Sequence, residues 1–285
     1  MAWLDELAGP GHEQVTMSEV AEFTFEGERI RLMDRGRGIR HPESMRSALS
    51  ITTTFTATNE APRYLDSKGP DGLQRYKYRG DRGGDAENRA VQHAMRDGSP
   101  MIWFVGSSPR MYVPIYPVWI IGDEPAQSQF VVAFDGFQRQ LQPGDTTQRE
   151  YAERITRERM HQPVFRALVL RAYSHRCAMC RLKYPLLLDA AHILPDGHPR
   201  GEPVISNGLS LCKIHHAAYD ENYLGVRPDF VVEVRPDVKE GTDGPMLMHG
   251  IQEMDGTRLQ VPGSAILRPD RLRLEERYEE FRRTR

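Results

Sequence analysis

Residues 177–220 read CAMCRLKYPLLLDAAHILPDGHPRGEPVISNGLSLCKIHHAAYD, and this stretch decides the fold of the C-terminal part of the chain. Two short motifs bracket its middle part, Cys177-Ala-Met-Cys180 and Cys212-Lys-Ile-His215, with 31 residues between them. Each spacing lets two ligands converge on one ion from a tight turn, and two such turns complete a tetrahedron. Because three thiolates and one imidazole leave no open position, we expect all four residues to bind a structural zinc ion.

All three cysteines of the chain lie in these two motifs. An odd number excludes a disulfide framework as the main means of holding the fold together, and it is typical of a reducing, cytoplasmic setting. Two alternatives remain, which are three unrelated buried thiols or a redox-active pair at Cys177 and Cys180. A redox pair would need a thioredoxin-like βαβ pattern around it, and the sequence has none.

The segment between the two motifs predicts two strands followed by a helix. The apolar run over 186–193 is typical of a strand, and His192 lies at its end. Asn207-Gly208 predicts a turn into a second apolar run, and His216 and Asp220 follow on an expected helix. The segment therefore carries a histidine at a strand end, an asparagine in a turn and a histidine on a helix, which is the ββα-metal arrangement.

These residue types suit hydrolysis of a phosphodiester, which needs a base to activate water and a cation to absorb negative charge. His192, neutral near pH 7, suits the base. Asn207 offers both a donor and an acceptor, so it can hold the loop that carries His192. His216 and Asp220 share one helix face, and we expect them to bind the catalytic ion. The alternative for Asp220 is a surface carboxylate or a helix cap.

Residues 163–226 resemble the HNH endonucleases, with His192, Asn207 and His216 as the signature residues. The resemblance implies an enzyme that cleaves DNA with a divalent ion, either Mg²⁺ or another ion such as Mn²⁺, Co²⁺ or Ni²⁺. Many members carry a metal-binding Asp or His directly before the base, where this chain has Ala191. Asp189 lies two residues earlier, and it either reaches the ion, directly or through water, or is a structural acceptor.

The rest of the chain predicts a β-rich domain and a connecting helix. The stretch from Phe23 to Leu32 alternates apolar and polar residues as a half-buried strand does, and the stretch 85–98 predicts a short helix closed by Gly98. The composition becomes strongly charged and helical over 141–162. We therefore expect an α+β protein with a β-rich domain at 1–140, a helical linker at 141–162 and a zinc-stabilised nuclease domain at 163–285 that ends in a helix.

The β-rich domain resembles the SRA (YDG) domains, which read 5-methylcytosine by base flipping within a PUA-like fold. The resemblance spans about residues 50–135. It rests on short motifs in the family's order, namely Tyr64-Leu-Asp66, Gly69–Gly72, Tyr76-Lys-Tyr78-Arg79-Gly80, Gly83-Gly84-Asp85 and Asn88-Arg89. The loop at Asn88-Arg89 is shorter than in the family, and Arg79 stands where the family motif has threonine.

A flipped base must lie between two π faces and be read along its polar edge. The resemblance implies that Tyr64 and Tyr78 supply the two faces and that Asp66 accepts a hydrogen bond from the cytosine N4 amino group. It also implies that Asn88 and Arg89 contact DNA, together with Arg79, at the gap that the flipped base leaves. The alternative for the tyrosines is that they are ordinary half-buried strand aromatics.

Together the two resemblances imply a modification-dependent endonuclease, similar to bacterial type IV restriction enzymes, that recognises 5-methylcytosine or 5-hydroxymethylcytosine in double-stranded DNA. One alternative is a phosphorothioate-dependent enzyme that uses the basic stretch Arg31–Arg46. Others are a nonspecific HNH nuclease and, because of Ala191, an inactive DNA-binding module. Since a single HNH site cuts one strand, cleavage of both strands implies a homodimer, for which the linker and C-terminal helices are the candidate interface.

Composition limits the class of protein and of partner. The chain has 285 residues, of which 39% are hydrophobic and 27% charged, as is typical of soluble globular proteins. No run approaches the roughly 20 apolar residues of a membrane span, and we see no secretory signal at the N-terminus. We therefore expect a cytoplasmic protein without a membrane partner. The net charge of −2 means that DNA binding must depend on local clusters of basic residues.

Overall fold

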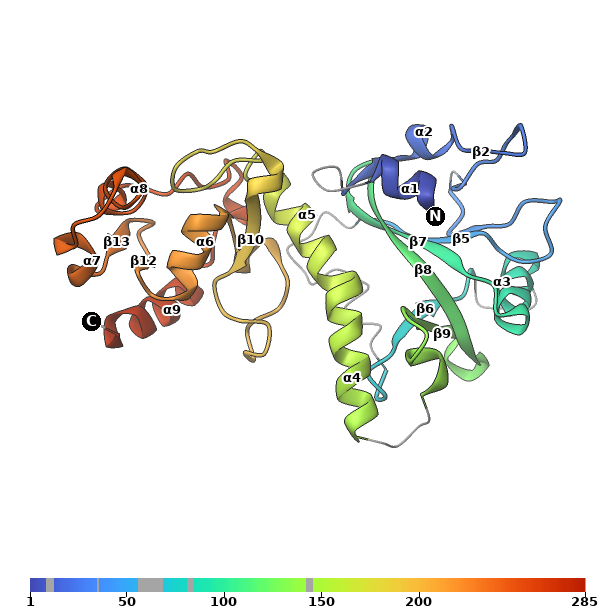
Figure 1. Ribbon diagram of the computed structural model, residues 1–285. Coiled ribbons are helices and arrows are strands. Elements are labelled where there is room, and N and C mark those ends of the chain that lie inside the picture. The colour runs from blue at the N-terminus through green and yellow to red at the C-terminus, as the bar shows by residue number, and fades with distance from the viewer. Residues whose placement is uncertain (9–12, 35, 56–68, 81–84, 142–145, 285) are drawn as a thin grey trace. The chain divides into compact units, whose positions relative to one another are not determined.

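The computed structural model describes residues 1–8, 13–34, 36–55, 69–80, 85–141 and 146–284. They form two compact units, and the chain passes from the first to the second between Val164 and Phe165. Both units combine helices with strands, so the α+β class expected from the sequence is confirmed (Figure 1). Helix α4 (Thr146–Thr156), a π-helical turn (Arg157–His161) and α5 (Gln162–Ala172) follow one another, and the division between the units falls within α5.

A curled sheet forms the centre of the first unit. Its order is β4 (Ile39–Arg40), β5 (Ser50–Thr53), β7 (Met101–Ser108), β8 (Met111–Glu124), β9 (Gln129–Ala133) and β6 (Gln74–Lys77), and β1 (Val15–Thr16) pairs with the start of β8. β5 and β7 are parallel, and the other neighbours are antiparallel. The long strand β8 pairs with β7 as far as Val118 and with β9 from Trp119, which joins the two halves of the sheet.

Helices cover this sheet and close its core. They are α1 (Ala2–Leu7), α2 (Met17–Val20) and α3 (Ala86–Asp97), with 3-10 turns at Pro125–Gln127 and Gln138–Gln140. The short helix predicted within 85–98 is confirmed as α3, and Gly98 ends it at a φ of +61° with its N–H bonded to carbonyls of the last turn. The buried interior is mostly aliphatic and also contains large aromatic side chains, among them Trp103, Phe104, Phe130 and Phe134.

The single strand predicted from Phe23 to Leu32 is wrong. The structure has instead a small hairpin of β2 (Thr24–Phe25) and β3 (Glu28–Arg29). Glu26 and Gly27 form its turn with φ of +50° and +81°, so the chain reverses where the alternating pattern predicts continuation. Phe25 is 56% exposed, because the reversal removes it from the core side of the sheet.

The second unit is built on a hairpin of β10 (Leu188–His192) and β11 (Gly208–Cys212), followed by α6 (Lys213–Asp220). A second hairpin follows, β12 (Leu224–Val226) with β13 (Val232–Val234), and then α7 (Pro236–Glu240), α8 (Pro245–Gly250) and α9 (Arg271–Arg283). Connecting 3-10 turns lie at Pro185–Leu187, Ile205–Asn207, Gln252–Met254 and Ala265–Leu267. Apolar side chains from α5, α6, α9 and both hairpins share one core.

The C-terminal helix α9 packs inside this unit. Leu274 and Phe281 are both buried. A Cβ at Gly225 would lie 2.5 Å from the Phe281 ring, so only glycine lets the ring approach β12 this closely. These two apolar side chains of α9 are therefore covered within the same chain.

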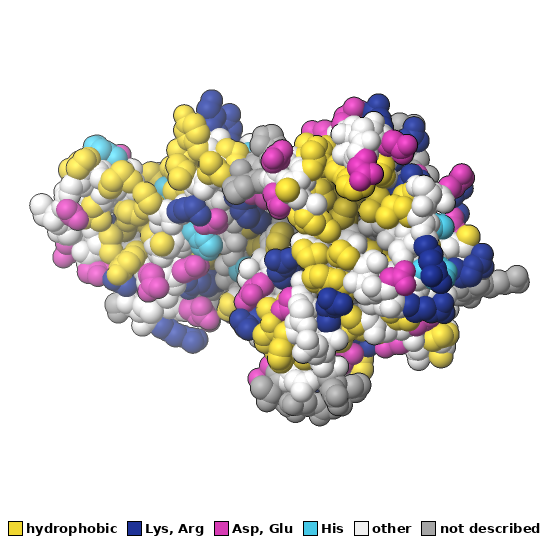
Figure 2. Space-filling view, turned by 45° about the vertical axis from the view of Figure 1, so that its right-hand side comes forward, with side chains coloured by type: hydrophobic (Ala, Val, Ile, Leu, Met, Phe, Trp, Pro, Cys, Tyr) yellow, Lys and Arg dark blue, Asp and Glu magenta, His cyan; other side chains and the backbone are white. Residues whose placement is uncertain are grey.

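The surface carries charges of both signs. On the face shown in Figure 2, Lys and Arg side chains are interspersed with Asp and Glu, and hydrophobic side chains lie between them. Among the described residues, no helix combines the length and the apolar character needed to cross a membrane.

Candidate metal sites and active site

The two cysteine motifs meet in the second unit. Sγ of Cys177 and Sγ of Cys212 lie 3.4 and 3.2 Å from Nδ1 of His215, and Sγ of Cys180 lies 3.9 Å from Sγ of Cys212. All four donor atoms lie within 4.8 Å of one another. In the part of the chain that the structure describes, no other group of three or more His, Cys, Asp and Glu residues is as close.

Local structure brings the two motifs together. Cys212 ends β11 and precedes the first turn of α6, so His215 follows it on the same side. The N–H of Ala178 donates to the carbonyl of Ser210, which ties the first motif to β11. Arg181 closes the first turn at a φ of +63°, with its N–H bonded to the carbonyl of Cys177.

The chemistry of the four donors fits zinc. Hydrogen bonds from the thiols of Cys180 and Cys212 lower the pKa of the Cys177 thiol well below its usual range. Burial lowers the pKa of His215, but its hydrogen bonds to Cys177 and Cys212 outweigh burial and raise it to about 10. A bound cation would displace the imidazole proton and would be held by the thiolate and the freed ring nitrogen. On its other side the ring contacts the carbonyl of Gly250 through Nε2, at 2.7 Å, the outer contact that orients metal-binding histidines.

The same hairpin joins this cluster to the predicted active site. Leu188 pairs with Cys212 at one end of the hairpin, and His192 pairs with Gly208 at the other. The cluster of three cysteines and His215 therefore lies where β11 ends, and His192 lies where β10 ends.

Helix α5 supplies the surface against which His192 lies. The rings of His192 and Phe165 stack with centroids 4.1 Å apart and an interplanar angle of 19°. A Cβ at Gly208 would lie 2.4 Å from Val169 and 3.0 Å from Phe165, so glycine is required where β11 passes α5. No sequence pattern predicts Phe165 as a site residue, since an apolar residue on a helix face indicates only burial.

Asn207 is buried and holds the loop that follows His192. Its Oδ1 accepts from the N–H of Leu194 at 3.0 Å, and its Nδ2 donates to the carbonyls of Leu194 and Glu202 at 3.0 and 3.1 Å. The backbone carbonyl of Asn207 also accepts from the N–H of Ile193 at 2.9 Å. These bonds use both ends of the amide, so the side chain of Asn207 links the exit of β10 to the entrance of β11.

His216 lies between two carboxylates. Its Nε2 is 3.3 Å from Oδ2 of Asp220, and its Nδ1 is 3.6 Å from Oδ2 of Asp189. Asp189 also has two cations beside it, Lys213 at 3.3 Å and Arg166 at 4.0 Å. The two acids predicted to bind the catalytic ion therefore approach opposite nitrogens of one imidazole.

A pocket opens beside these residues. His192, His216 and Asp220 line it, and Asp189 is absent from its lining, whose other members are Ile193, Pro195, Asp196, Asn222, Arg277 and Glu280. The pocket thus brings together the proposed base and two proposed ion ligands from β10 and α6. Within this pocket His192 is half-buried, and its Nε2 atom is shielded from solvent.

Arg277 on α9 fixes the end of α6, and no sequence pattern predicts this role. It donates to the carbonyls of Tyr219 and Asp220 at 2.7 and 3.4 Å and also bonds the side chain of Asn222. Its guanidinium lies 4.8 Å from the centre of the Tyr219 ring. Because the last carbonyls of a helix lack partners within it, Arg277 completes α6 at the turn that carries Asp220.

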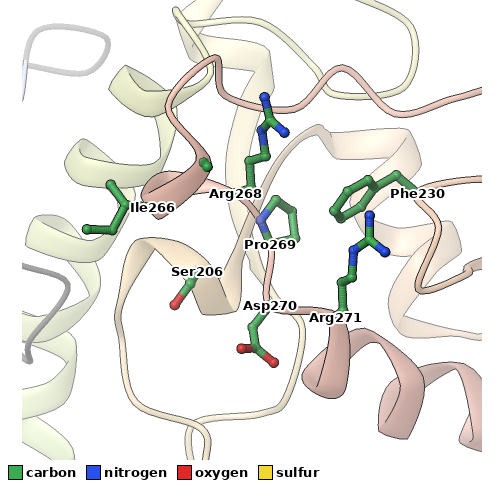
Figure 3. A pocket seen from close by; sticks show the side chains of 8 residues that line it. Ser206, Phe230, Ile266, Arg268, Pro269, Asp270 and Arg271 are labelled. Carbon is green, nitrogen blue, oxygen red and sulfur yellow. The ribbon is translucent and has the colours of Figure 1, made fainter.

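A second pocket of this unit, shown in Figure 3, is lined by residues that hold neighbouring segments of the chain together. The guanidinium of Arg271 lies 5.2 Å from the Phe230 ring, and Arg268 donates to the carbonyls of Pro262 and Gly263. Asp270 caps α9 by accepting from the N–H of Arg273, and its own N–H donates to the carbonyl of Ser206. Its walls thereby connect α9 to the turn that contains Asn207.

Only part of the predicted base pocket falls within the described residues. Tyr64 and Asp66 lie outside them. Tyr78 is buried, its ring packs 4.6 Å from that of Phe130, and its hydroxyl donates to Asp123. Burial and that hydrogen bond raise the pKa of Tyr78 to about 12. The Tyr78 side chain is thus held from both sides in this conformation.

The residues expected to contact DNA beside that pocket have different surroundings. Asn88 is buried, and its amide bonds both the N–H and the carbonyl of Arg79 at 3.0 Å, so it holds a turn in this conformation. The guanidinium of Arg79 pairs with Glu87. Arg89 is exposed on α3.

Comparison with known proteins identifies one part of the chain. Residues 177–227 match the family model described as HNH endonuclease. No curated protein matches the chain. Among solved structures it is similar to one described as "Modification dependent TagI restriction endonuclease", with 16% identity, a TM-score of 0.33 and coverage of 86% of this chain and 85% of that one. The family match contains both cysteine motifs, β10, β11 and α6, so this segment is similar to the HNH endonucleases in sequence.

Proposed function

We propose that this protein is a metal-dependent DNA endonuclease whose hydrolytic site is the pocket beside β10 and α6. The observation that carries the proposal is that His192, His216 and Asp220 line one pocket within the segment that matches the HNH endonucleases. A base and a pair of ion ligands facing one open space are what phosphodiester hydrolysis requires.

His192 is assigned as the base that activates water. Stacking on Phe165 restricts the rotation of its ring, and the hydrogen bonds of Asn207 restrict the backbone that follows it. A ring held in this way keeps its nitrogen at one position relative to the pocket. Such orientation of a catalytic group lowers the activation barrier of the reaction. Asn207 acts through His192 and is a positioning residue.

The ion is assigned to Nε2 of His216 and the carboxylate of Asp220. One imidazole and one carboxylate leave several positions for water and phosphate oxygen, as is typical of Mg²⁺ and Mn²⁺ sites. When bound, the ion would offset negative charge on the phosphate and on the leaving oxygen. The role of this chain is to hold His216 and Asp220 on one helix face while Arg277 fixes the end of that helix.

We do not assign Asp189 as a ligand of the ion. It approaches Nδ1 of His216, whereas the pocket and Asp220 lie toward Nε2. Lys213 and Arg166 already offset its charge, which makes it a poor place for a further cation. A carboxylate that binds the far nitrogen of a metal-binding histidine fixes the ring and its tautomer, and this is the role we assign to Asp189.

The first unit is proposed to select the substrate as an SRA-like reader of modified cytosine by base flipping. This part of the proposal rests on the motif order over residues 64–89 and on the need of an HNH domain for a targeting element. Tyr64, Asp66 and Tyr78 are the proposed pocket. A homodimer is proposed for cleavage of both strands.

Cleavage of a matched set of plasmids tests the function. The set contains unmodified, 5-methylcytosine, 5-hydroxymethylcytosine and phosphorothioate DNA, each with Mg²⁺ and with Mn²⁺. Cutting confined to modified cytosine supports the reader, and Tyr78→Ala should then weaken that selectivity while the zinc content stays the same. Cutting of every plasmid would retain the nuclease and remove the modified-base reader. Cutting confined to phosphorothioate DNA would replace modified cytosine as the substrate, and absence of cutting would contradict the nuclease.

A further inference from the structure

The first unit contains a hollow. Three segments of the chain line it: the start of the chain around α2, the stretch before β4, and the turn between β7 and β8. The pairing of β1 with β8 brings the first and third together, with Thr16 opposite Met111. The lining residues are Thr16, Met17, Ser18, Ala21, Arg31, Met33, Arg110 and Tyr112.

Two guanidinium groups in this hollow are available to bind an anion. Arg31 and Arg110 are exposed, and within the described part of the chain neither side chain makes a hydrogen bond or an ion pair. Other arginines of the same basic stretch differ, because Arg37 pairs with Glu87 at 3.3 Å and Arg40 pairs with Asp34 at 3.2 Å. Arg31 and Arg110 thus bring two cations without acidic partners among the described residues to one hollow.

The remaining lining suits an anion with an apolar neighbour. No acid lines the hollow, while Met17, Met33 and Ala21 give it an apolar floor and Thr16 and Ser18 contribute hydroxyls. The Glu19 carboxylate accepts hydrogen bonds from the N–H and the hydroxyl of Thr16 at 2.6 and 2.8 Å, so this carboxylate already has hydrogen-bond donors of its own.

The backbone supports the placement of both arginines. The carbonyl of Arg31 accepts a hydrogen bond from Nε of Arg40 at 3.0 Å. Arg110 has a φ of +64°, a left-handed backbone conformation that residues other than glycine seldom adopt. The turn between β7 and β8 imposes this conformation. Arginine binds phosphate oxygens through two parallel N–H donors, so two of them around one hollow match a phosphodiester.

We propose that the hollow of Arg31 and Arg110 binds phosphate groups of the DNA backbone. It gives the first unit a contact that is independent of sequence and of modification, and such contacts set affinity and orientation on the duplex. The choice of DNA rests on the proposed function, whereas the phosphate chemistry rests on the hollow itself.

The test compares two double variants that remove equal charge. Arg31→Gln/Arg110→Gln empties the hollow of cations, and Arg37→Gln/Arg149→Gln removes two cations that already have acidic partners, Glu87 and Glu153. Binding of each full-length protein to a fluorescent duplex is measured by anisotropy over a salt series without added divalent ion. We expect the first variant to bind about tenfold more weakly, with the slope of log K against log salt smaller by about 2, equally for modified and unmodified duplexes. The control should keep the slope of the wild type.

Equal losses in both variants, or an unchanged slope in the first, would overturn the proposal. Titration with inorganic phosphate and with a phosphorylated dinucleotide forms a second arm. Binding of these small esters that depends on Arg31 and Arg110, without duplex binding, would assign the hollow to a free phosphate ester and overturn the DNA assignment. The anisotropy assay needs no cleavage, so a failed nuclease and a failed phosphate site give different results.

Discussion

His192 stacks on Phe165 with ring centroids 4.1 Å apart and an interplanar angle of 19°, so a helix outside residues 177–227 orients the proposed base. Phe165→Leu keeps most of the buried volume and removes the flat surface. We expect this variant to cost about 1 kcal/mol in stability and to lower the cleavage rate about tenfold to a hundredfold, because the base loses its orientation. Single-turnover cleavage beside thermal unfolding measures both effects. The same replacement at Phe134, which stacks on Trp103 in the first unit, is the control.

Zinc is expected at one ion per chain, bound by Cys177, Cys180, Cys212 and His215. Since β11 ends at Cys212, loss of the ion should release the hairpin that carries His192. Cys180→Ser and a strong chelator should each reduce the zinc content, lower the unfolding temperature of the second unit and abolish cleavage. Elemental analysis with thermal unfolding measures this. A metal-free protein that keeps its unfolding temperature would contradict the structural role.

Asp189 and Asp220 should respond differently to substitution, because they approach opposite nitrogens of His216. Asp220→Asn removes a charged ligand and should nearly abolish Mn²⁺ binding. Asp189→Asn leaves the ligands in place and should weaken Mn²⁺ binding about tenfold to a hundredfold, as is typical of outer carboxylates. Calorimetric titration with Mn²⁺ separates these effects without any cleavage. If Asp189→Asn abolishes binding and Asp220→Asn spares it, the two assignments must be exchanged.

The Tyr78 hydroxyl should stabilise the first unit in a pH-dependent manner. Burial and the hydrogen bond to Asp123 raise the pKa of Tyr78 to about 12, above the ordinary value of about 10. A raised pKa means that the stabilisation is complete below pH 10 and is lost as the pH rises toward 12. The difference in unfolding free energy between the wild type and Tyr78→Phe should therefore shrink from pH 8 to pH 11. A difference that grows over this range would show that the phenol is ionised in the folded protein.

Local spacing predicted the parts of this structure that depend on neighbouring residues. The two cysteine motifs, the helix ended by Gly98 and the order of β10, β11 and α6 follow from patterns a few residues long. The strand expected from Phe23 to Leu32 failed because Glu26 and Gly27 adopt left-handed conformations, which the apolar alternation does not encode.

Contacts between distant segments could not be predicted in the same way. Phe165 reaches His192 from another helix, and Arg277 reaches the carbonyl of Tyr219 across 58 residues of sequence. The position of Asp189 beside Nδ1 of His216 likewise depends on how α6 packs on the hairpin. No local pattern marks Phe165 or Arg277 for these contacts, and for Asp189 the sequence leaves open whether it reaches the ion or is a structural acceptor.

Cleavage by His192→Ala tests the central claim most directly. Purified wild type, His192→Ala and His198→Ala are compared on supercoiled plasmid with Mg²⁺ and with Mn²⁺, at equal zinc content. His198 is the matched control, because it pairs with Glu276 and does not line the pocket. We predict that the wild type and His198→Ala cut the same plasmids and that His192→Ala is slower by at least about a hundredfold. Undiminished cutting by His192→Ala would contradict the assignment of hydrolysis to this pocket.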